Sequence, residues 1–407
     1  MYDMNGKIEK NEDQKKYEQN LKEMIMAETI SAVDQEDLSK FRKFHSLLAE
    51  LFSSLFSVAE VEDFDGSLLI KWAGKSSDAP ILLMSHHDVV EACGAWTHQP
   101  FGGEISDGKL WGRGTLDTKT NLWAMLQAAD DIAALGIKPE KDIYFISTCN
   151  EEVSGEGARL ISEVLKRRGL EFEFILDEGN GIFLEDLDAP IGIGEKGVTE
   201  LEFIARSEGG HASRPPKNTP LVRLGRFMAA VEDNLDEIFP KEVNAATGEV
   251  QQTSIAFTVA QASQSRNVIP TRASVIVSMR SSHHQTVEGS IAAISAFAKK
   301  YDIETEILFH GMTSALSDTN TPAYGMITDL IKSHFPGSKT RPTIMLGATD
   351  ACYLSALSNC ILRFSPLLVT REQRAAVHGD DENINLSSLV PAVEFYKKII
   401  QSSHYPV

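Results

Sequence analysis

The segment Ile81–Val90 reads ILLMSHHDVV. It opens with four apolar residues, and a short run of this kind is typical of a strand buried inside a sheet. His86, His87 and Asp88 follow almost directly, and all three side chains are able to bind metal. Ligands of α/β proteins bind outside the carboxyl ends of the strands. The segment therefore predicts a buried strand with a functional site at its end.

Similar apolar runs recur along the chain and alternate with helical patterns. Strands are predicted at Ile143–Ser147 and Phe172–Leu176, and helices at Tyr17–Ile30, Lys40–Phe56, Asn121–Leu135, Gly157–Arg168 and Ala323–Ser333. Strands that alternate with helices of this length indicate an α/β domain with a mostly parallel sheet.

One stretch follows a different order. It predicts, in turn, a strand at Val198–Arg206, a helix at Leu221–Phe239, strands at Thr253–Val259 and Ala273–Arg280, a helix at Val287–Lys299 and a strand at Thr305–His310. The order βαββαβ is that of a ferredoxin-like domain. We therefore expect a small α+β domain over residues 198–310, inserted into a larger domain formed by residues 1–197 and 311–407.

Composition and charge exclude several classes of protein. Of the 407 residues, 42% are hydrophobic and 24% are charged, which is ordinary for a globular protein with a full core. The formal charge is −19, from 39 Lys and Arg against 58 Asp and Glu, and it disfavours binding to nucleic acid or to an anionic membrane. No run of 18 apolar residues predicts a membrane span. Residues 1–20 lack the apolar core of a signal peptide, and the four cysteines are scattered, so we expect a cytoplasmic protein.

Other metal-capable side chains stand where further strands and turns should end. Asp117 lies in the glycine-containing run GRGTLDTK, residues 112–119, and Glu151 and Glu152 follow the strand at Ile143–Ser147. The pair Asp177 and Glu178 follows the next predicted strand, and a lone histidine, His378, comes late in the chain. Taken singly, each has an ordinary alternative: a capped helix start, a solvated acidic loop or a structural histidine.

Taken together, these side chains form one donor set. Histidine nitrogens and carboxylate oxygens suit zinc, with cobalt or manganese as substitutes. Adjacent carboxylates at the end of a buried strand repel each other and are costly to hold without a cation. An aspartate between two half-sites would bridge two ions roughly 3.5–4 Å apart, as in two-metal hydrolases.

Motifs along nearly the whole chain beyond about residue 20 resemble the M20 family of metallopeptidases and amidohydrolases. They are His86-x-Asp88-Val89-Val90, Trp96 through Pro100-Phe101 to Gly112-Arg113-Gly114, Asp117-x-Lys119, Glu151-Glu152, Gly210-His211-Ala212-Ser213 with Pro215, Asn267-Val268-Ile269-Pro270, Thr349-Asp350 and His378-Gly379. The runs Glu151–Gly155 and Arg363–Pro366 look most like the branch that contains carboxypeptidase S and N-acyl-amino-acid hydrolases.

The resemblance implies a role for each matching residue. His86 and Glu178 would bind one metal, Glu152 and His378 the other, and Asp117 would bridge them. Asp177 is the alternative to Glu178, and a shifted register would exchange His86 with His87.

The resemblance also implies catalytic residues. Asp88 would support His86, Glu151 would be the general base, and His211 would reach an active site across a dimer interface to stabilise the oxyanion. Asn267 would help to bind substrate, and Arg280 and Arg363 are candidates for holding a substrate carboxylate.

The implied protein is a homodimer of zinc-peptidase catalytic domains, each with an inserted dimerisation (lid) domain and two Zn²⁺ per subunit. Its expected reaction is hydrolysis of the amide bond of small peptides or N-acyl amino acids by a metal-bridged water. The alternative is a biosynthetic deacylase of the acetylornithine deacetylase or succinyl-diaminopimelate desuccinylase type. A non-catalytic binding protein and a two-metal phosphoesterase are weaker readings, because no ligand type is missing and no phosphate-binding loop is present.

Overall fold

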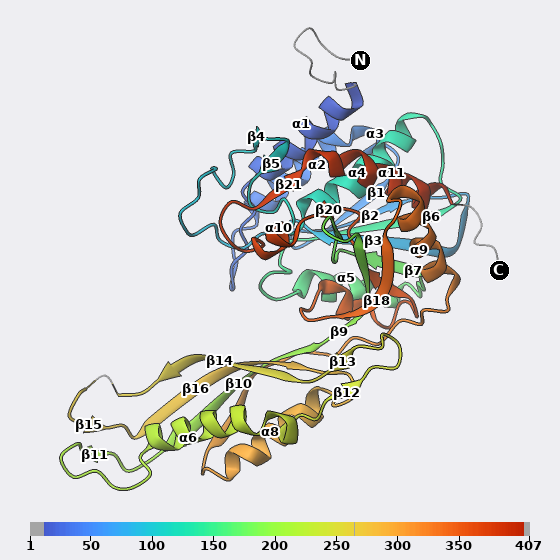
Figure 1. Ribbon diagram of the computed structural model, residues 1–407. Helices are drawn as coiled ribbons and strands as arrows, with labels where there is room; N and C mark the ends of the chain where they lie inside the picture. Colours follow the sequence, from blue (N-terminus) through green and yellow to red (C-terminus); the bar gives the residue numbers. More distant parts are fainter. Residues whose placement is uncertain (1–11, 264, 403–407) are drawn as a thin grey trace. The chain divides into compact units, whose positions relative to one another are not determined.

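The computed structural model describes residues 12–263 and 265–402 (Figure 1). The first eleven residues, on which part of the argument against a signal peptide rests, lie outside this range. The described chain divides into two units. The first contains residues up to Ile193 together with Ser317–Thr343 and Thr349 onward, and the second contains Gly194–Leu316 and Ile344–Ala348.

The first unit is built on an eight-stranded sheet whose centre is parallel. β3 (Ser76–His86) lies between β6 (Lys141–Thr148) and β7 (Phe174–Asp177), and β19 (Ile361–Arg363) continues the parallel run beside β7. The sheet is completed by β2 (Ser67–Trp72) and β1 (Glu60–Phe64) at one side, both antiparallel to their neighbours, and by β9 (Asp188–Glu195) and β18 (Lys339–Met345) at the other. The predicted α/β class with a mostly parallel sheet is confirmed.

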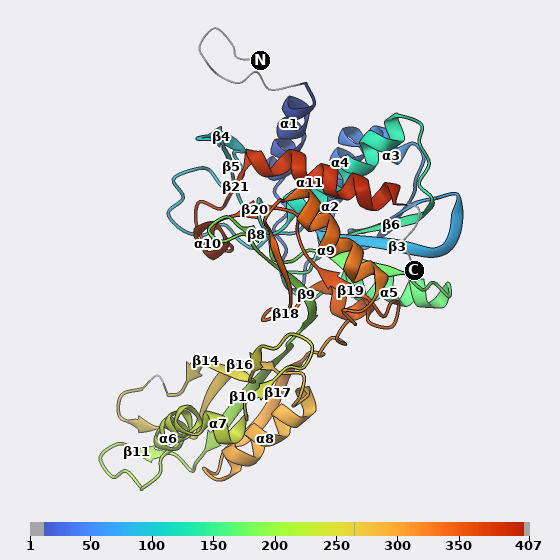
Figure 2. The same ribbon diagram turned by 45° about the vertical axis from the view of Figure 1, so that its right-hand side comes forward.

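Helices cover both faces of this sheet. α4 (Lys119–Ala134) and α11 (Leu389–Gln401) lie on one face, with α1 (Glu12–Met26) against α4, and α5 (Glu156–Arg167) lies on the other (Figure 2). Alternate residues of β3 serve the two faces, because successive side chains of a strand point in opposite directions. Leu82 and Met84 accordingly belong to the apolar cluster that contains Ile161 and Leu165 of α5.

Shorter elements surround the sheet. They are α2 (Ser39–Leu51), α3 (Ser53–Phe56), α9 (Pro322–His334), α10 (Arg371–Ala375), the 3-10 helices at Asp350–Leu354 and Leu386–Ser388, the three-stranded sheet of β4 (Glu104–Ser106), β5 (Lys109–Trp111) and β21 (Asn383–Asn385), and the pair of β8 (Ile182–Phe183) with β20 (Leu368–Val369). Among the helices of the described residues, none is both long and apolar enough to span a membrane.

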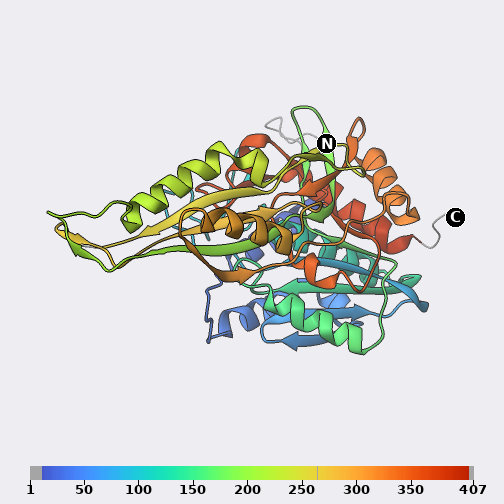
Figure 3. The same cartoon turned by 90° about the horizontal axis from the view of Figure 1, so that it is seen from below.

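The second unit has the predicted βαββαβ order. Its elements are β10 (Gly197–Arg206), α6 (Pro220–Asp233), β14 (Ser254–Gln261), β16 (Arg272–Ser281), α8 (Val287–Lys299) and β17 (Glu304–His310), with the short pieces α7 (Leu235–Ile238), β12 (Glu242–Val243) paired with β13 (Val250–Gln251), and β11 (Gly210–His211) paired with β15 (Val268–Ile269). The four main strands form an antiparallel sheet in the order β14-β16-β10-β17. α6 and α8 pack on the same face of it (Figure 3), around Phe203 and Phe227.

The predicted small domain, residues 198–310, lies within this second unit. The unit also includes Ile344–Ala348, which no sequence pattern singled out. The backbone explains the addition, because Lys196 N donates to Met345 O at 3.1 Å.

Candidate metal centre

The candidate ligands stand at the carboxyl ends of three parallel strands. β3 ends at His86, Glu151 and Glu152 follow β6, and Glu178 follows β7 directly. Because parallel strands end at the same edge of a sheet, three segments far apart in sequence deliver their side chains to one place.

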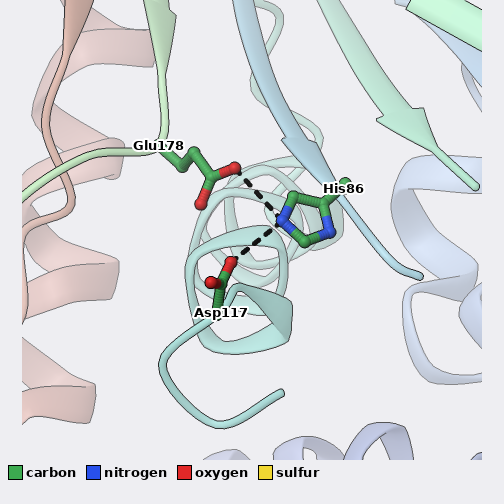
Figure 4. A group of neighbouring side chains, drawn as sticks. All are labelled: His86, Asp117 and Glu178. Atoms are coloured by element: carbon green, nitrogen blue, oxygen red, sulfur yellow. Dashed lines mark hydrogen bonds and ion pairs between the residues drawn. The ribbon is translucent and has the colours of Figure 1, made fainter. Parts of the chain in front are cut away.

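His86 is the centre of the first group of donors (Figure 4). Its Nε2 atom lies 3.0 Å from Asp117 Oδ1 and 3.2 Å from Glu178 Oε1. Its other nitrogen, Nδ1, donates to the backbone carbonyl of Asp88 at 2.9 Å. That bond keeps the proton of a neutral ring on Nδ1 and turns the lone pair of Nε2 towards the two carboxylates.

His378 is the centre of the second group. Its Nε2 atom lies 3.1 Å from Asp117 Oδ2 and 3.2 Å from Glu152 Oε2. Asp117 therefore belongs to both groups, with one oxygen facing each histidine. Two three-donor groups joined through one carboxylate have the layout of a two-metal site.

A tight turn presents Asp117. The turn precedes α4, which begins at Lys119, and Gly114 adopts a φ of +86° within it. A Cβ atom at Gly114 would come within 2.8 Å of Val89 Cγ1. Only glycine fits both the backbone conformation and the close approach to the end of the HHDVV segment.

His378 is brought to the site by strand pairing. It lies between α10 and β21, and β21 pairs with β5, with Asn383 opposite Trp111. The pairing sets residues 378–382 beside the turn that follows β5, which is the turn that carries Asp117. In the sequence, His378 was identified only through the family resemblance, because it lies more than 250 residues from Asp117, which it contacts.

Asp88 connects two of the strand ends. Its Oδ1 and Oδ2 atoms accept hydrogen bonds from the backbone N–H groups of Glu151 and Glu152, both at 3.1 Å, and Oδ1 lies 3.4 Å from His86 Nδ1. The predicted support of His86 by Asp88 thus includes a second function, because the same carboxylate fixes the backbone of the glutamate pair.

Glu151 stands beside the donors without joining either group. Its Oε2 atom lies 4.0 Å from His86 Nε2. Burial and the negative charges of Asp350, Glu178 and Glu152 hold the pKa of Glu151 well above its ordinary value, although His86 opposes them. Hydrogen bonds to Asp117 and Glu152 raise the pKa of His378 to about 10.

The donor set fits divalent metal. The five side chains His86, Asp117, Glu152, Glu178 and His378 supply nitrogen and carboxylate oxygen, the ligand types of zinc sites. Glu152 Oε1 is buried and makes no hydrogen bond to the residues that the structure describes. Clustered buried carboxylates repel one another, and a cation is the usual compensation.

Two neighbours of the predicted ligands turn away from the groups. His87 is fully buried, its Nδ1 atom lies 2.7 Å from Ser147 Oγ, and its ring stacks on Phe44. Asp177, the alternative to Glu178, is buried and its Oδ1 atom accepts the backbone N–H of Glu178 at 2.8 Å. Of the two adjacent acidic residues at the end of β7, the structure therefore places Glu178 at His86.

The predicted substrate-binding residues come from both units. Arg363 is fully buried on β19, and its Nη1 atom donates to Ile361 O at 2.9 Å. His211, Asn267 and the half-buried Arg280 belong to the second unit. His211 and Asn267 are neighbours there, because Ala212 N donates to Asn267 O at 2.9 Å across the β11–β15 pair.

Three buried residues near the donors received no role from the sequence. Arg113 and Glu382 form an ion pair at 2.7 Å, and Asp350 lies in the 3-10 helix that follows Thr349. Burial raises the pKa of Asp350 to about 7. In the sequence, the motif Thr349-Asp350 could have drawn attention to Asp350, and the glycine-containing turn to Arg113. Glu382 was marked only by the acidic run that follows His378.

Comparisons with known proteins identify the family. The model of peptidase family M20/M25/M40 matches residues 82–402. A probable carboxypeptidase S-like protein 2 from Dictyostelium discoideum is 26% identical over 438 residues, covering 95% of this chain and 84% of that protein. The human N-fatty-acyl-amino acid synthase/hydrolase PM20D1 is 28% identical over 414 residues, covering 90% of this chain and 82% of that protein.

The fold is matched as well. The M20 family metallo-carboxypeptidase Sso-CP2 from Sulfolobus solfataricus superimposes with a TM-score of 0.72 at 16% identity, covering 96% of this chain and 99% of that one. The predicted family resemblance is confirmed: the chain belongs to peptidase family M20/M25/M40 and is a metallohydrolase of the M20 type.

Proposed function

We propose that this protein hydrolyses the amide bond of small peptides or of N-acyl amino acids with a free carboxylate, using two zinc ions. The observation that carries the proposal is the position of Asp117, whose two oxygens lie 3.0 Å from His86 and 3.1 Å from His378. The activities named for the two relatives, carboxypeptidase and N-fatty-acyl-amino acid hydrolase, both cleave an amide bond beside an amino acid.

His86, Glu178 and Asp117 would hold one ion, and Asp117, Glu152 and His378 the other. When bound, two zinc ions would lower the pKa of a bound water to about 7 and would polarise the substrate carbonyl. The chain itself would keep the ligands oriented, through the bond from His86 Nδ1 to Asp88 O and the bonds from Glu151 N and Glu152 N to the Asp88 carboxylate.

Glu151 would move the proton. Its buried carboxylate would accept a proton from the attacking water and deliver it to the nitrogen of the departing amine, as the C–O bond forms and the C–N bond breaks. Burial and the neighbouring carboxylates raise the pKa of Glu151, and a higher pKa makes its carboxylate a stronger base for the proton of the water.

His211 would stabilise the oxyanion from a partner subunit of a homodimer. Its Nδ1 atom accepts the backbone N–H of Ser213 at 3.1 Å, so a neutral ring carries its proton on Nε2. The histidine is exposed, and Nε2–H is a donor suited to a developing negative charge.

The test is a substrate panel assayed with and without a chelator. The panel contains dipeptides, N-acetyl and N-fatty-acyl amino acids, acetylornithine and succinyl-diaminopimelate, and products are identified by mass spectrometry. We expect cleavage of peptides or N-acyl amino acids that stops on chelation and returns with Zn²⁺ or Co²⁺. Turnover that persists in the presence of the chelator would overturn the mechanism. Turnover of acetylornithine or succinyl-diaminopimelate alone would reassign the protein to biosynthetic deacylation.

A further inference from the structure

A buried ion pair lies next to the candidate metal centre without belonging to it. The side chains of Arg113 and Glu382 are 1% and 0% exposed, and Arg113 Nη1 donates to Glu382 Oε2 at 2.7 Å. Neither residue belongs to the two donor groups. Since a buried ion pair often adds little to stability compared with apolar residues of the same size, its presence calls for another explanation.

Glu382 holds the backbone that carries Asp117. Its Oε1 atom accepts the N–H groups of Leu116 at 2.7 Å and Asp117 at 3.2 Å, and Oε2 accepts that of Gly114 at 3.2 Å. Both oxygens are therefore engaged along one turn. One of these three residues, Asp117, is the candidate bridging ligand.

Arg113 reaches from the same turn to the loop of His378. Its Nη2 atom donates to the carbonyl of Gly379, the residue after His378, at 3.0 Å. In addition, Gly112 N donates to Glu382 O at 2.9 Å. The ion pair thus joins the two loops that carry Asp117 and His378, two ligands that are far apart in the sequence.

We propose that Arg113 and Glu382 are positioning residues that set the distance between Asp117 and His378. They would thereby set the affinity for the metal ion held by Asp117, Glu152 and His378. The proposal rests on the proposed function. Groups that hold ligands in place typically change metal affinity by about 10- to 100-fold when they are replaced.

The same segment offers a matched control. Asp381, the neighbour of Glu382, is 3 residues from His378 in sequence but binds another loop, through the backbone N–H groups of Thr97 at 2.8 Å and His98 at 3.0 Å. An Asp381→Asn variant removes one charge from the segment and leaves every bond to Asp117 in place.

The experiment measures zinc affinity by competition with a coloured chelator in the full chain, and folding by circular dichroism and thermal melting. In Glu382→Gln, a neutral amide faces Arg113 in place of the carboxylate. In Arg113→Lys, the guanidinium that binds both Glu382 and the carbonyl of Gly379 is lost. We expect both variants to be folded and to bind the zinc of the Asp117, Glu152 and His378 group about 10- to 100-fold less tightly. Asp381→Asn should remain within about threefold of wild type, and cobalt spectra should change only in the first two variants.

Three outcomes would overturn the proposal. Folded Glu382→Gln and Arg113→Lys variants with wild-type zinc affinity would exclude the positioning role and leave the proposed function standing. Equal losses in all three variants would show a general effect of charge or stability. Failure of the wild type to bind zinc would overturn the proposed function and this inference together. If Glu382→Gln does not fold, the zinc affinity of Arg113→Lys alone tests the proposal.

Discussion

Asp117 is the residue on which the two donor groups depend, because it is the only side chain common to both among the described residues. Each of its oxygens faces a histidine from a different part of the chain, His86 on β3 and His378 before β21. Hydrogen bonds from the protonated rings of His378 and His86 hold the pKa of Asp117 below its ordinary value, against the effect of burial. The carboxylate is therefore ionised, as a bridging ligand must be.

Replacing Glu151 should separate chemistry from metal binding. In Glu151→Gln the side chain keeps its size but loses the ability to take a proton, so we expect kcat to fall by about 10²- to 10⁴-fold with metal content unchanged. Steady-state kinetics and elemental analysis measure the two quantities. Glu163→Gln, an exposed glutamate on α5 that pairs with Arg159, is the control and should keep wild-type kcat. A Glu151→Gln variant with nearly full activity would remove Glu151 from the mechanism.

Sequence motifs predicted the five donors but could not show what orients them. Strand ends marked His86, Glu152 and Glu178, since buried strands leave a clear apolar signal. The hydrogen bonds that the Glu382 carboxylate accepts from backbone N–H groups leave no such signal in the sequence. Any acidic side chain is able to accept a backbone N–H, so residue type does not identify the one that does. The family resemblance favoured Glu178 over Asp177, and the structure places Glu178 at His86.

At the scale of helices and strands, periodicity predicted the main elements and missed local interruptions. The pattern over Lys40–Phe56 predicted one helix, whereas the chain breaks at Phe52 between α2 and α3. The break has a tertiary cause: Asp130 of α4 accepts the backbone N–H groups of Ser54 and Leu55 at 2.8 and 3.1 Å and so caps a new helix. A cap supplied by a distant residue cannot be read from local spacing.

A contact between α2 and the β1–β2 turn makes stability depend on pH. His45 Nε2 donates to Gly66 O at 2.9 Å, and burial lowers the pKa of His45 below its usual 6.5, although Asp63 opposes the shift. The unfolded chain binds this proton near pH 6.5 and the folded chain only at lower pH. Stability contributed by His45 is therefore present above pH 6.5 and lost as pH falls through the folded pKa.

Urea unfolding at several pH values measures this effect. Below pH 6.5, we expect the wild type to lose stability more steeply than His45→Gln, by up to about 1.4 kcal/mol per pH unit for one proton. Glutamine keeps an N–H donor for Gly66 and does not titrate. Parallel curves for the two proteins would show that His45 has the same pKa in the folded and unfolded chains.

At the scale of the whole molecule, the candidate oxyanion donor lies on a different unit from the metal ligands. Mixing two inactive variants tests whether His211 acts on a partner subunit. In a dimer of Glu151→Gln with His211→Ala, one site would combine an intact Glu151 with an intact His211. Random exchange should therefore restore activity at about a quarter of the sites, because half of the dimers are mixed and each has one complete site. No recovery in verified mixed dimers would show that His211 does not act across subunits.

The measurement that tests the two-metal site most directly is the zinc content of the wild type, His378→Ala and Asp117→Asn after dialysis against a weak chelator. His378 serves one donor group and Asp117 serves both. We predict two ions per chain in the wild type, one in His378→Ala, and weakened binding of both in Asp117→Asn. One ion or none in the wild type, or two retained in His378→Ala, would contradict a pair of ions held through Asp117.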